Sequence, residues 1–300
     1  MISSNSQEDI INKAALVYFS PYKSTKKTGD EIVNNLSMME YTCDYFNIAQ
    51  DEKKVCDSLY SNLDSYNLLV IGGPVYCEHM VGAIERFLKN LPQGEKEVII
   101  YATFGGVCSG KVLPDMATIL NRKGYKIISA AKVMSEHSMM FKSKKPLGRE
   151  KPGKMNGPKL RTMVETALGQ KNMKNGTGLT VKELTTQTMF VRVLLLLLFN
   201  PKVMYSFFLP RVLFNPSKCN SCNACSTTCP AENISEISLS PTFSDEKCLR
   251  CYNCVRVCKQ GVYTARLKSF SYTLRVFWLL SFLFEKQETE IFFPQNLKQN

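Results

Sequence analysis

Two stretches of this chain share one cysteine spacing: Cys219-Asn-Ser-Cys222-Asn-Ala-Cys225-Ser-Thr-Thr-Cys229 and Cys248-Leu-Arg-Cys251-Tyr-Asn-Cys254-Val-Arg-Val-Cys258. The second stretch lies 29 residues after the first, and together they hold eight of the chain's 12 cysteines. Three thiolates at this spacing can surround three corners of an iron–sulfur cube, while the fourth cysteine is carried away from that loop. The pattern therefore indicates two iron–sulfur clusters.

Two other uses of cysteine fit the pattern less well. Structural zinc takes two separated pairs of ligands, whereas each stretch here has a triplet and one further cysteine. Disulfide frameworks are typical of short secreted chains, and this chain has 300 residues with no apolar signal segment at its start. Zinc and disulfides stay as alternatives to the favoured iron–sulfur interpretation. Cys43, Cys56, Cys77 and Cys108 are expected to be free thiols.

Residues 215–264 resemble the bacterial-type ferredoxins that bind two 4Fe-4S clusters, with all eight ligand positions present. The resemblance implies that the fourth cysteine of each stretch binds the other cluster. One cluster would be held by Cys219, Cys222, Cys225 and Cys258, and the other by Cys248, Cys251, Cys254 and Cys229. Pro230 follows the first stretch as in that family, but Lys259 replaces the second proline, which leaves the local turn open. Short strands are expected at 234–240 and 261–266.

The front part of the chain alternates strand and helix patterns. Apolar, β-prone stretches predict strands at 14–20, 67–72, 97–103 and 124–133. Helices are expected near 28–39, at 80–91 and at 158–169, and a further helix is expected after the third of these strands, ending at about residue 123. Such alternation predicts a parallel sheet covered by helices on both faces. The polar loops follow the strands at their carboxyl ends, which is where open α/β sheets bind ligands.

Residues 12–170 resemble a flavodoxin, which implies a doubly wound parallel sheet with strand order 2-1-3-4-5 and FMN between the first and third strands. The phosphate loop is expected at 20–25, where Ser20, Ser24 and Thr25 offer hydroxyl groups before a helix. Tyr22 and Lys23 replace the threonine and glycine that the family has there. Lys23 is expected to supply a charge for the phosphate, with altered or weakened FMN binding as the other outcome.

Two further loops are expected to hold the flavin ring. Gly73-Pro74-Val75-Tyr76 places an aromatic residue where flavodoxins stack one on the isoalloxazine, so Tyr76 is the expected stacking residue. Thr103-Phe104-Gly105-Gly106 is expected along the flavin edge, because glycine allows close approach of the backbone. The alternative is an ordinary half-buried tyrosine and simple turn glycines. Neither His79 nor His137 has a visible partner for a site, and both are expected in loops or on the surface.

The net charge of +12 is concentrated in the middle of the chain. Residues 1–140 have 14 basic and 16 acidic side chains, residues 141–218 have 15 and 3, and residues 219–300 have 9 and 7. The aromatic residues of the basic middle lie in apolar stretches, which argues against a nucleic-acid-binding surface. No Gly-x-Gly-x-x-Gly fingerprint for NAD(P)H is present, so electrons are expected to come from a redox partner protein, attracted by these basic residues.

The sequence predicts four parts: a flavodoxin-like, FMN-binding domain at 1–172, a connector with short helices at 173–214, a ferredoxin-like domain at 215–264, and an apolar helix and tail at 265–300. The apolar stretches at 189–199, 203–209 and 270–284 are each shorter than the roughly twenty residues of a bilayer span. We expect them to pack the second domain onto the first, with peripheral membrane contact as the less favoured alternative. A reducing, cytoplasmic location is expected.

These expectations converge on one hypothesis, an electron-transfer protein that contains FMN and two 4Fe-4S clusters and exchanges electrons with a partner. A flavin handles one or two electrons and each cluster handles one, so their combination can convert between the two modes. The alternative is an FMN-dependent reductase of a small acceptor that its own clusters feed. That alternative predicts an open pocket over the flavin.

Overall fold

The computed structural model describes residues 12–49, 51–148, 156–169, 178–185, 209–235, 242–244, 247–282 and 285–294. The apolar stretch at 189–199 and nearly all of that at 203–209 lie outside these ranges, so their expected packing role stays a prediction.

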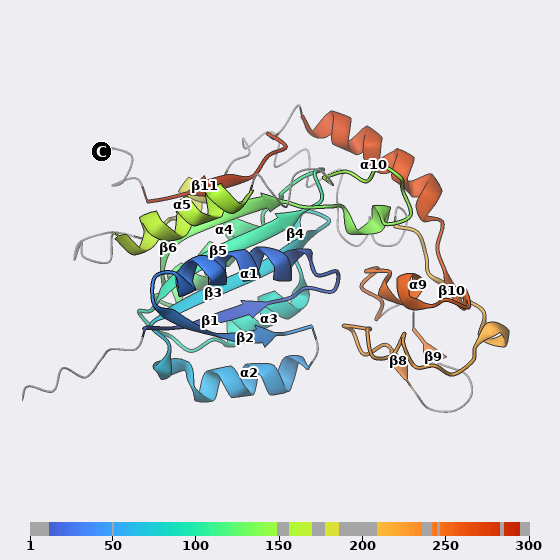
Figure 1. Cartoon of the computed structure of the whole chain (residues 1–300), viewed down its shortest axis with the longest axis horizontal. Helices are drawn as coiled ribbons and strands as arrows, with labels where there is room; N and C mark the ends of the chain where they lie inside the picture. The colour runs from blue at the N-terminus through green and yellow to red at the C-terminus, as the bar shows by residue number, and fades with distance from the viewer. Residues whose placement is uncertain are drawn as a thin grey trace, which may run out of the picture.

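Parallel strands form the centre of the molecule (Figure 1). They are β1 (Asn12–Tyr18), β2 (Tyr41–Asn47), β3 (Leu68–Tyr76), β5 (Glu97–Phe104) and β6 (Lys126–Met134), arranged in the order β2-β1-β3-β5-β6. The short strand β4 (His79–Met80) forms an antiparallel hairpin with the end of β3. The parallel strands therefore have the expected order 2-1-3-4-5, which confirms the predicted fold class.

Helices cover both faces of this sheet (Figure 1). One face packs against α1 (Ser24–Ser37) and α5 (Asn156–Gly169), and the other against α2 (Glu52–Ser61), α3 (Gly82–Asn90), α4 (Val112–Arg122) and α6 (Val181–Leu184). Leu68 and Val70 of β3 belong to the first core, and Leu69 and Ile71 belong to the second. Both sides of the strand are buried, which explains its uninterrupted apolar sequence.

Besides the short strand β4, two strands of the sheet were not located from the sequence. The edge strand β2 has mixed polar and apolar residues and is only partly buried, so it lacks the apolar signal of the central strands. β11 (Glu290–Phe292) pairs antiparallel with β6, although about 150 residues separate them in the chain. The tail predicted at 265–300 thus returns to the first domain.

The cysteine-rich part lies beside the carboxyl ends of the parallel strands (Figure 1). It contains β7 (Leu213–Phe214), β8 (Ile234–Ser235), β9 (Thr242–Phe243), α9 (Asn253–Val257) and β10 (Tyr263–Thr264), with antiparallel pairs β7–β10 and β8–β9. From there α10 (Leu267–Ser281) extends back toward the sheet. Within the described residues no helix is long and apolar enough to cross a membrane.

A buried ion pair fixes the returning tail to the sheet. Lys132 Nζ of β6 lies 2.8 Å from Glu285 Oε1, and both side chains are 2% exposed. The backbone N–H of Ser109 donates to Glu285 Oε2 at 3.0 Å, and Lys132 also lies 3.2 Å from Glu290 of β11. The segment after α10 is therefore held by charge as well as by strand pairing.

Removing the cation from this pair should loosen the tail. Lys132→Met leaves the Glu285 carboxylate buried without its counter-ion, a change that typically costs about 3–5 kcal/mol. We expect hydrogen–deuterium exchange in β11 to become at least about tenfold faster. Lys126→Met on the same strand is the control, because Lys126 lies 3.6 Å from Glu97 at a site where the lysine side chain is 35% exposed. Equal exchange in the two variants would contradict this role of the pair.

Candidate functional site

The two cysteine stretches adopt the same backbone conformation. Left-handed residues follow the first two cysteines of each stretch at matching positions, namely Ser221 (φ 56°) and Asn223 (φ 55°) in one and Arg250 (φ 52°) and Tyr252 (φ 59°) in the other. L-residues adopt this conformation at a cost, so its repetition at four matching sites marks a specific loop shape. The two stretches therefore share one loop shape.

Backbone N–H groups point at the cysteine sulfur atoms in both stretches. Ser221 N–H donates to Cys219 Sγ at 3.4 Å, and the equivalent Arg250 N–H donates to Cys248 Sγ at 3.4 Å. The fourth cysteines accept in the same way, Cys229 from Asn233 N–H at 3.4 Å and Cys258 from Val262 N–H at 3.3 Å. Hydrogen bonds to sulfur are one of the means by which a protein sets the potential of an iron–sulfur cluster.

Cys229 of the first stretch lies among the cysteines of the second. Burial raises the pKa of Cys254 to about 12, and the nearby thiols of Cys251, Cys248 and Cys229 raise it as well. Burial likewise raises the pKa of Cys251 to about 11, with Cys229 and Cys248 as its acidic neighbours. These four side chains are the quartet that the ferredoxin resemblance implies for one cluster.

In the other expected quartet, Cys258 of the second stretch lies near Cys225 of the first. Burial raises the pKa of Cys225, and Cys258 of the second stretch is the thiol that raises it further. In the ranges that the structure describes, no three His, Cys, Asp or Glu side chains converge on a single metal ion. The four ligands of a 4Fe-4S cluster bind separate corners of a cube and need not meet at one ion.

The missing second proline does not change the turn after the cysteines. Glu232 N–H donates to Cys229 O at 3.1 Å, and Gly261 N–H donates to Cys258 O at 3.4 Å. Glu232 (φ 47°) and Gly261 (φ 67°) occupy equivalent positions and are both left-handed. Lys259 therefore stands in the same kind of turn that Pro230 begins.

A cavity of about 410 Å³ lies at the carboxyl ends of the strands, between the sheet and α10. The three predicted loops supply one part of its wall: Ser20, Ser24, Thr25, Pro74, Val75, Tyr76, Thr103, Phe104 and Gly105. Apolar side chains from the rest of the chain supply another: Leu209, Leu249, Phe270, Leu274, Phe277 and Leu280. The cavity is thus polar near the start of α1 and apolar below α10.

Three of the residues expected to bind FMN do not line this cavity. Lys23 is exposed and left-handed (φ 73°) at the start of α1, so the expected compensating charge lies off the cavity wall. Gly73 lies against Ile84 of α3, and Gly106 lies against Met134 of β6. Both glycines face neighbouring secondary structure and do not line the cavity, so their expected role in FMN binding stays a prediction.

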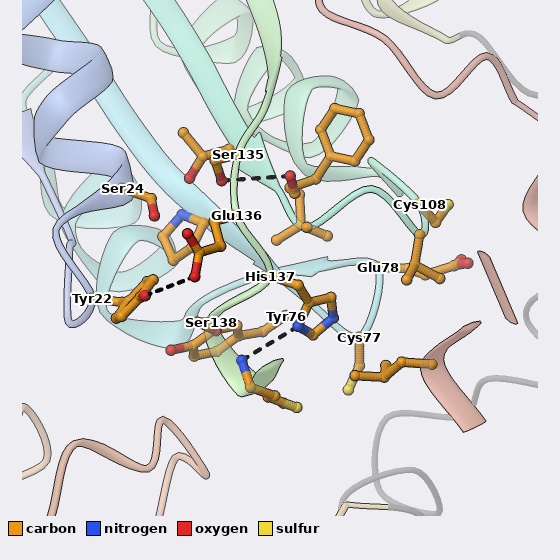
Figure 2. Close-up of a pocket in the computed structure, with 18 of the residues that line it drawn as sticks. Tyr22, Ser24, Tyr76, Cys77, Glu78, Cys108, Ser135, Glu136, His137 and Ser138 are labelled. Atoms are coloured by element: carbon orange, nitrogen blue, oxygen red, sulfur yellow. Dashed lines mark hydrogen bonds between the residues drawn. The ribbon is translucent and has the colours of Figure 1, made fainter. Parts of the chain in front are cut away.

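The sequence analysis missed residues 135–139 as part of the cavity wall. Figure 2 shows Glu136, His137 and Ser138 between the phosphate-loop residues Tyr22 and Ser24 and, on the opposite side, Cys77, Glu78 and Cys108. Tyr22 Oη donates to Glu136 Oε1 at 3.4 Å. These residues directly follow β6. Their place at the carboxyl end of a predicted strand was the signal that could have assigned them to the cavity wall.

His137 is held as a neutral imidazole. Burial lowers the pKa of His137 from 6.5 to about 4, and its Nδ1 accepts a hydrogen bond from Met139 N–H at 3.3 Å. Cys77 lies in the same cavity, and burial raises the pKa of its thiol to about 11. At neutral pH neither side chain brings a charge into the cavity.

The second cysteine stretch packs directly on the predicted phosphate loop. Asn253 Nδ2 donates to Pro21 O at 2.7 Å. The Arg256 guanidinium lies over the rings of Tyr22 and Phe141, 4.1 and 4.4 Å from their centroids, and donates to Ser138 O at 3.0 Å. Leu249, between two cysteines of the stretch, lines the cavity itself. Cavity and cysteine stretch are therefore parts of one site.

Comparison with known proteins assigns the cysteine-rich part. Residues 211–264 match the family model of the 4Fe-4S dicluster domain. The chain joins a flavodoxin-like sheet to a 4Fe-4S dicluster domain. No curated protein matches the chain.

Solved structures resemble the front part at low sequence identity. They include rubredoxin:oxygen oxidoreductase from Desulfovibrio gigas (18% identity, 53% of this chain and 36% of that chain, TM-score 0.41). An archaeal flavodoxin (17%, 53% and 99%, TM-score 0.40) and the Flv1 flavodiiron core from Synechocystis sp. PCC6803 (16%, 55% and 36%, TM-score 0.41) are also similar. The chain spans about a third of the length of the D. gigas enzyme.

The state of His137 predicts a pH dependence of stability. The unfolded chain binds a proton at this histidine below about pH 6.5, whereas the folded chain excludes it until about pH 4. Stability due to neutral His137 is thus complete above pH 6.5 and is lost as the pH falls toward 4. Between pH 7 and 5.5 the wild type should lose about 1 kcal/mol more than His137→Asn, whose amide oxygen can still accept from Met139 N–H.

Denaturant unfolding of both proteins at the two pH values measures this difference. An identical loss in wild type and variant would mean that His137 is not buried in its neutral form.

Proposed function

We propose that this protein transfers electrons between FMN, bound in the cavity, and two 4Fe-4S clusters, bound by the eight cysteines. The observation that carries the proposal is the direct packing of the second cysteine stretch on the predicted phosphate loop. The Asn253–Pro21 hydrogen bond and the Arg256 contacts with Tyr22 and Ser138 join the two candidate sites. Electrons could pass between sites in such contact without leaving the protein.

The cysteine side chains suit two clusters with exchanged fourth ligands. Cys229 is a neighbour of Cys251 and Cys254, and Cys258 is a neighbour of Cys225. A 4Fe-4S cluster would supply reversible one-electron chemistry. The chain provides thiolate ligands, backbone N–H donors to sulfur and an apolar core of Val212, Ile234, Val255, Val262 and Leu267 that limits access of water.

The cavity suits FMN in shape and polarity. Ser20, Ser24 and Thr25 lie where α1 begins, and the N-terminal end of a helix favours an anion such as a phosphate. The apolar wall and Tyr76 would border the ring, whose chemistry is the transfer of one or two electrons. Lys23 lies off the wall, so the phosphate would rely on hydroxyl and backbone groups.

The cover over the cavity favours an electron carrier over a reductase of small molecules. Phe270, Leu274 and Phe277 of α10 lie on the apolar side, and the Glu285 anchor follows directly after the helix. An FMN-dependent reductase needs room for its acceptor beside the flavin. We therefore retain electron transfer to a partner as the proposed activity, with the reductase as the alternative.

Anaerobically purified protein tests the cofactor content. We expect about eight iron atoms, about eight sulfides and about one FMN per chain, in keeping with two 4Fe-4S clusters and one flavin. Because of the exchanged ligands, Cys258→Ser should alter the same electron paramagnetic resonance signal as Cys222→Ser. Cys229→Ser should alter the same signal as Cys251→Ser. Zinc without sulfide would contradict the proposal. If Cys258→Ser altered the same signal as Cys251→Ser, the ligand assignment would be wrong.

A methyl group at Gly105 tests the flavin site. A Cβ at this position would lie 2.5 Å from His137 Cδ2, so the histidine and the adjoining wall must shift. We expect Gly105→Ala to weaken FMN binding by about tenfold or more, equivalent to about 1.4 kcal/mol, in fluorescence titrations of flavin-free protein. Gly157→Ala is the control, since nothing lies within 4 Å of its Cβ. Unchanged affinity in Gly105→Ala would place the flavin elsewhere.

A further inference from the structure

The two cysteine loops share a backbone conformation but differ in exposure. In the first loop Asn220, Ser221, Cys222 and Asn223 are all exposed. The equivalent residues 249–252 of the second loop are buried or partly buried. Of the eight cysteines, Cys222 is the exposed one. The backbone conformations match, so the difference comes from the side chains of each loop and from their surroundings.

The second loop is covered by the first domain and by the chain leading into the first stretch. Leu249 lines the cavity, Asn253 donates to Pro21 O, and Tyr252 Oη donates to Pro210 O at 2.9 Å. Residues 219–225, all of them described, are not part of the cavity wall. The second loop therefore faces the proposed flavin and the first loop faces solvent.

The exposed loop has a positive border. Lys218 precedes Cys219 and Lys259 follows Cys258, and both lysines are exposed. Cys219 and Cys258, the cysteines next to these lysines, both belong to the expected quartet that includes Cys222. The loop between them carries only short, uncharged side chains, so a partner can approach the cluster closely. The exposed Glu232 follows Cys229, which belongs to the other quartet.

We propose that residues 220–223, with Lys218 and Lys259, form the docking surface for an acidic, one-electron carrier protein. The proposal rests on the proposed function and adds the order of electron transfer, which runs from the partner to the exposed cluster, then to the covered cluster and then to the flavin. Each encounter moves one electron. The carrier loses this electron, the exposed cluster gains it, and no bond is made or broken. Two encounters supply the two electrons that a flavin takes up together with protons. The lysines would attract and orient the carrier.

Two small oxidants of opposite charge test this surface. Anaerobic protein with reduced clusters is mixed in a stopped-flow instrument with anionic ferricyanide or with cationic hexaammineruthenium(III), and cluster reoxidation is followed by absorbance. At low ionic strength, Lys218→Glu/Lys259→Glu should lower the ratio of the ferricyanide rate to the hexaammineruthenium rate by about tenfold. Lys53→Glu/Lys54→Glu is the matched control, because it changes net charge equally at two exposed lysines of α2.

A ratio that stays at the wild-type value in Lys218→Glu/Lys259→Glu, or that falls equally in both variants, would overturn the docking surface. Iron and sulfide analysis of each protein separates this result from loss of a cluster. If Lys218→Glu/Lys259→Glu does not fold, Lys218→Gln/Lys259→Gln takes its place. Absence of clusters from the wild type would instead refute the proposed function. Electron exchange with an acidic flavodoxin should likewise slow in the lysine variant at low salt.

Discussion

The structure depends on the contact between α9 and the loop after β1. Asn253 and Arg256 lie within the second cysteine stretch, and both reach residues at the carboxyl edge of the sheet. The planar guanidinium of Arg256 fits between two aromatic rings and still donates to a backbone carbonyl, which a lysine ammonium could not do in the same way. Burial lowers the pKa of Arg256, but a guanidinium stays charged under ordinary conditions. A fixed positive charge therefore stands where the two candidate sites meet.

This contact is supported by a second connection on the other side of the cavity. α10 leaves the dicluster domain and lies over the apolar wall, and Glu285 of the buried pair with Lys132 follows four residues after its last residue, Ser281. β11 then joins the sheet beside β6. The dicluster domain is thus attached to the sheet on both sides of the cavity, and its second loop cannot move away without breaking the Asn253–Pro21 and Arg256–Ser138 hydrogen bonds. Tethering at both ends would keep the two proposed redox sites at a constant separation, in place of a diffusional encounter.

Local patterns revealed most of the architecture. The apolar strands β1, β3, β5 and β6 and the repeated cysteine spacing are properties of short stretches. The expected sheet order and the dicluster domain followed from the flavodoxin and ferredoxin resemblances that these stretches carry. Contacts between distant residues were not visible in the same way. β11, the anchoring Glu285 and the wall residues 135–139 depend on how remote segments meet, and none has a distinctive sequence. Lys23 had the right charge for a phosphate, but it is exposed at the start of α1 and does not line the cavity.

The exposed side of α10 carries Tyr272, Val276, Leu279 and Phe282, so the helix is apolar on more than its packed face. The buried residues Leu267, Phe270 and Leu274 nevertheless fix its orientation over the cavity and the dicluster core. The predicted packing role of this stretch, with peripheral membrane contact as the alternative, stays a prediction.

The central claim is that flavin and clusters exchange electrons inside one chain. Laser-flash photoreduction of the bound flavin, followed by time-resolved absorbance of the clusters, measures that exchange directly. The account predicts a first-order transfer whose rate does not change with protein concentration. A rate proportional to protein concentration, or flavin reduction that never reaches the clusters, would contradict it.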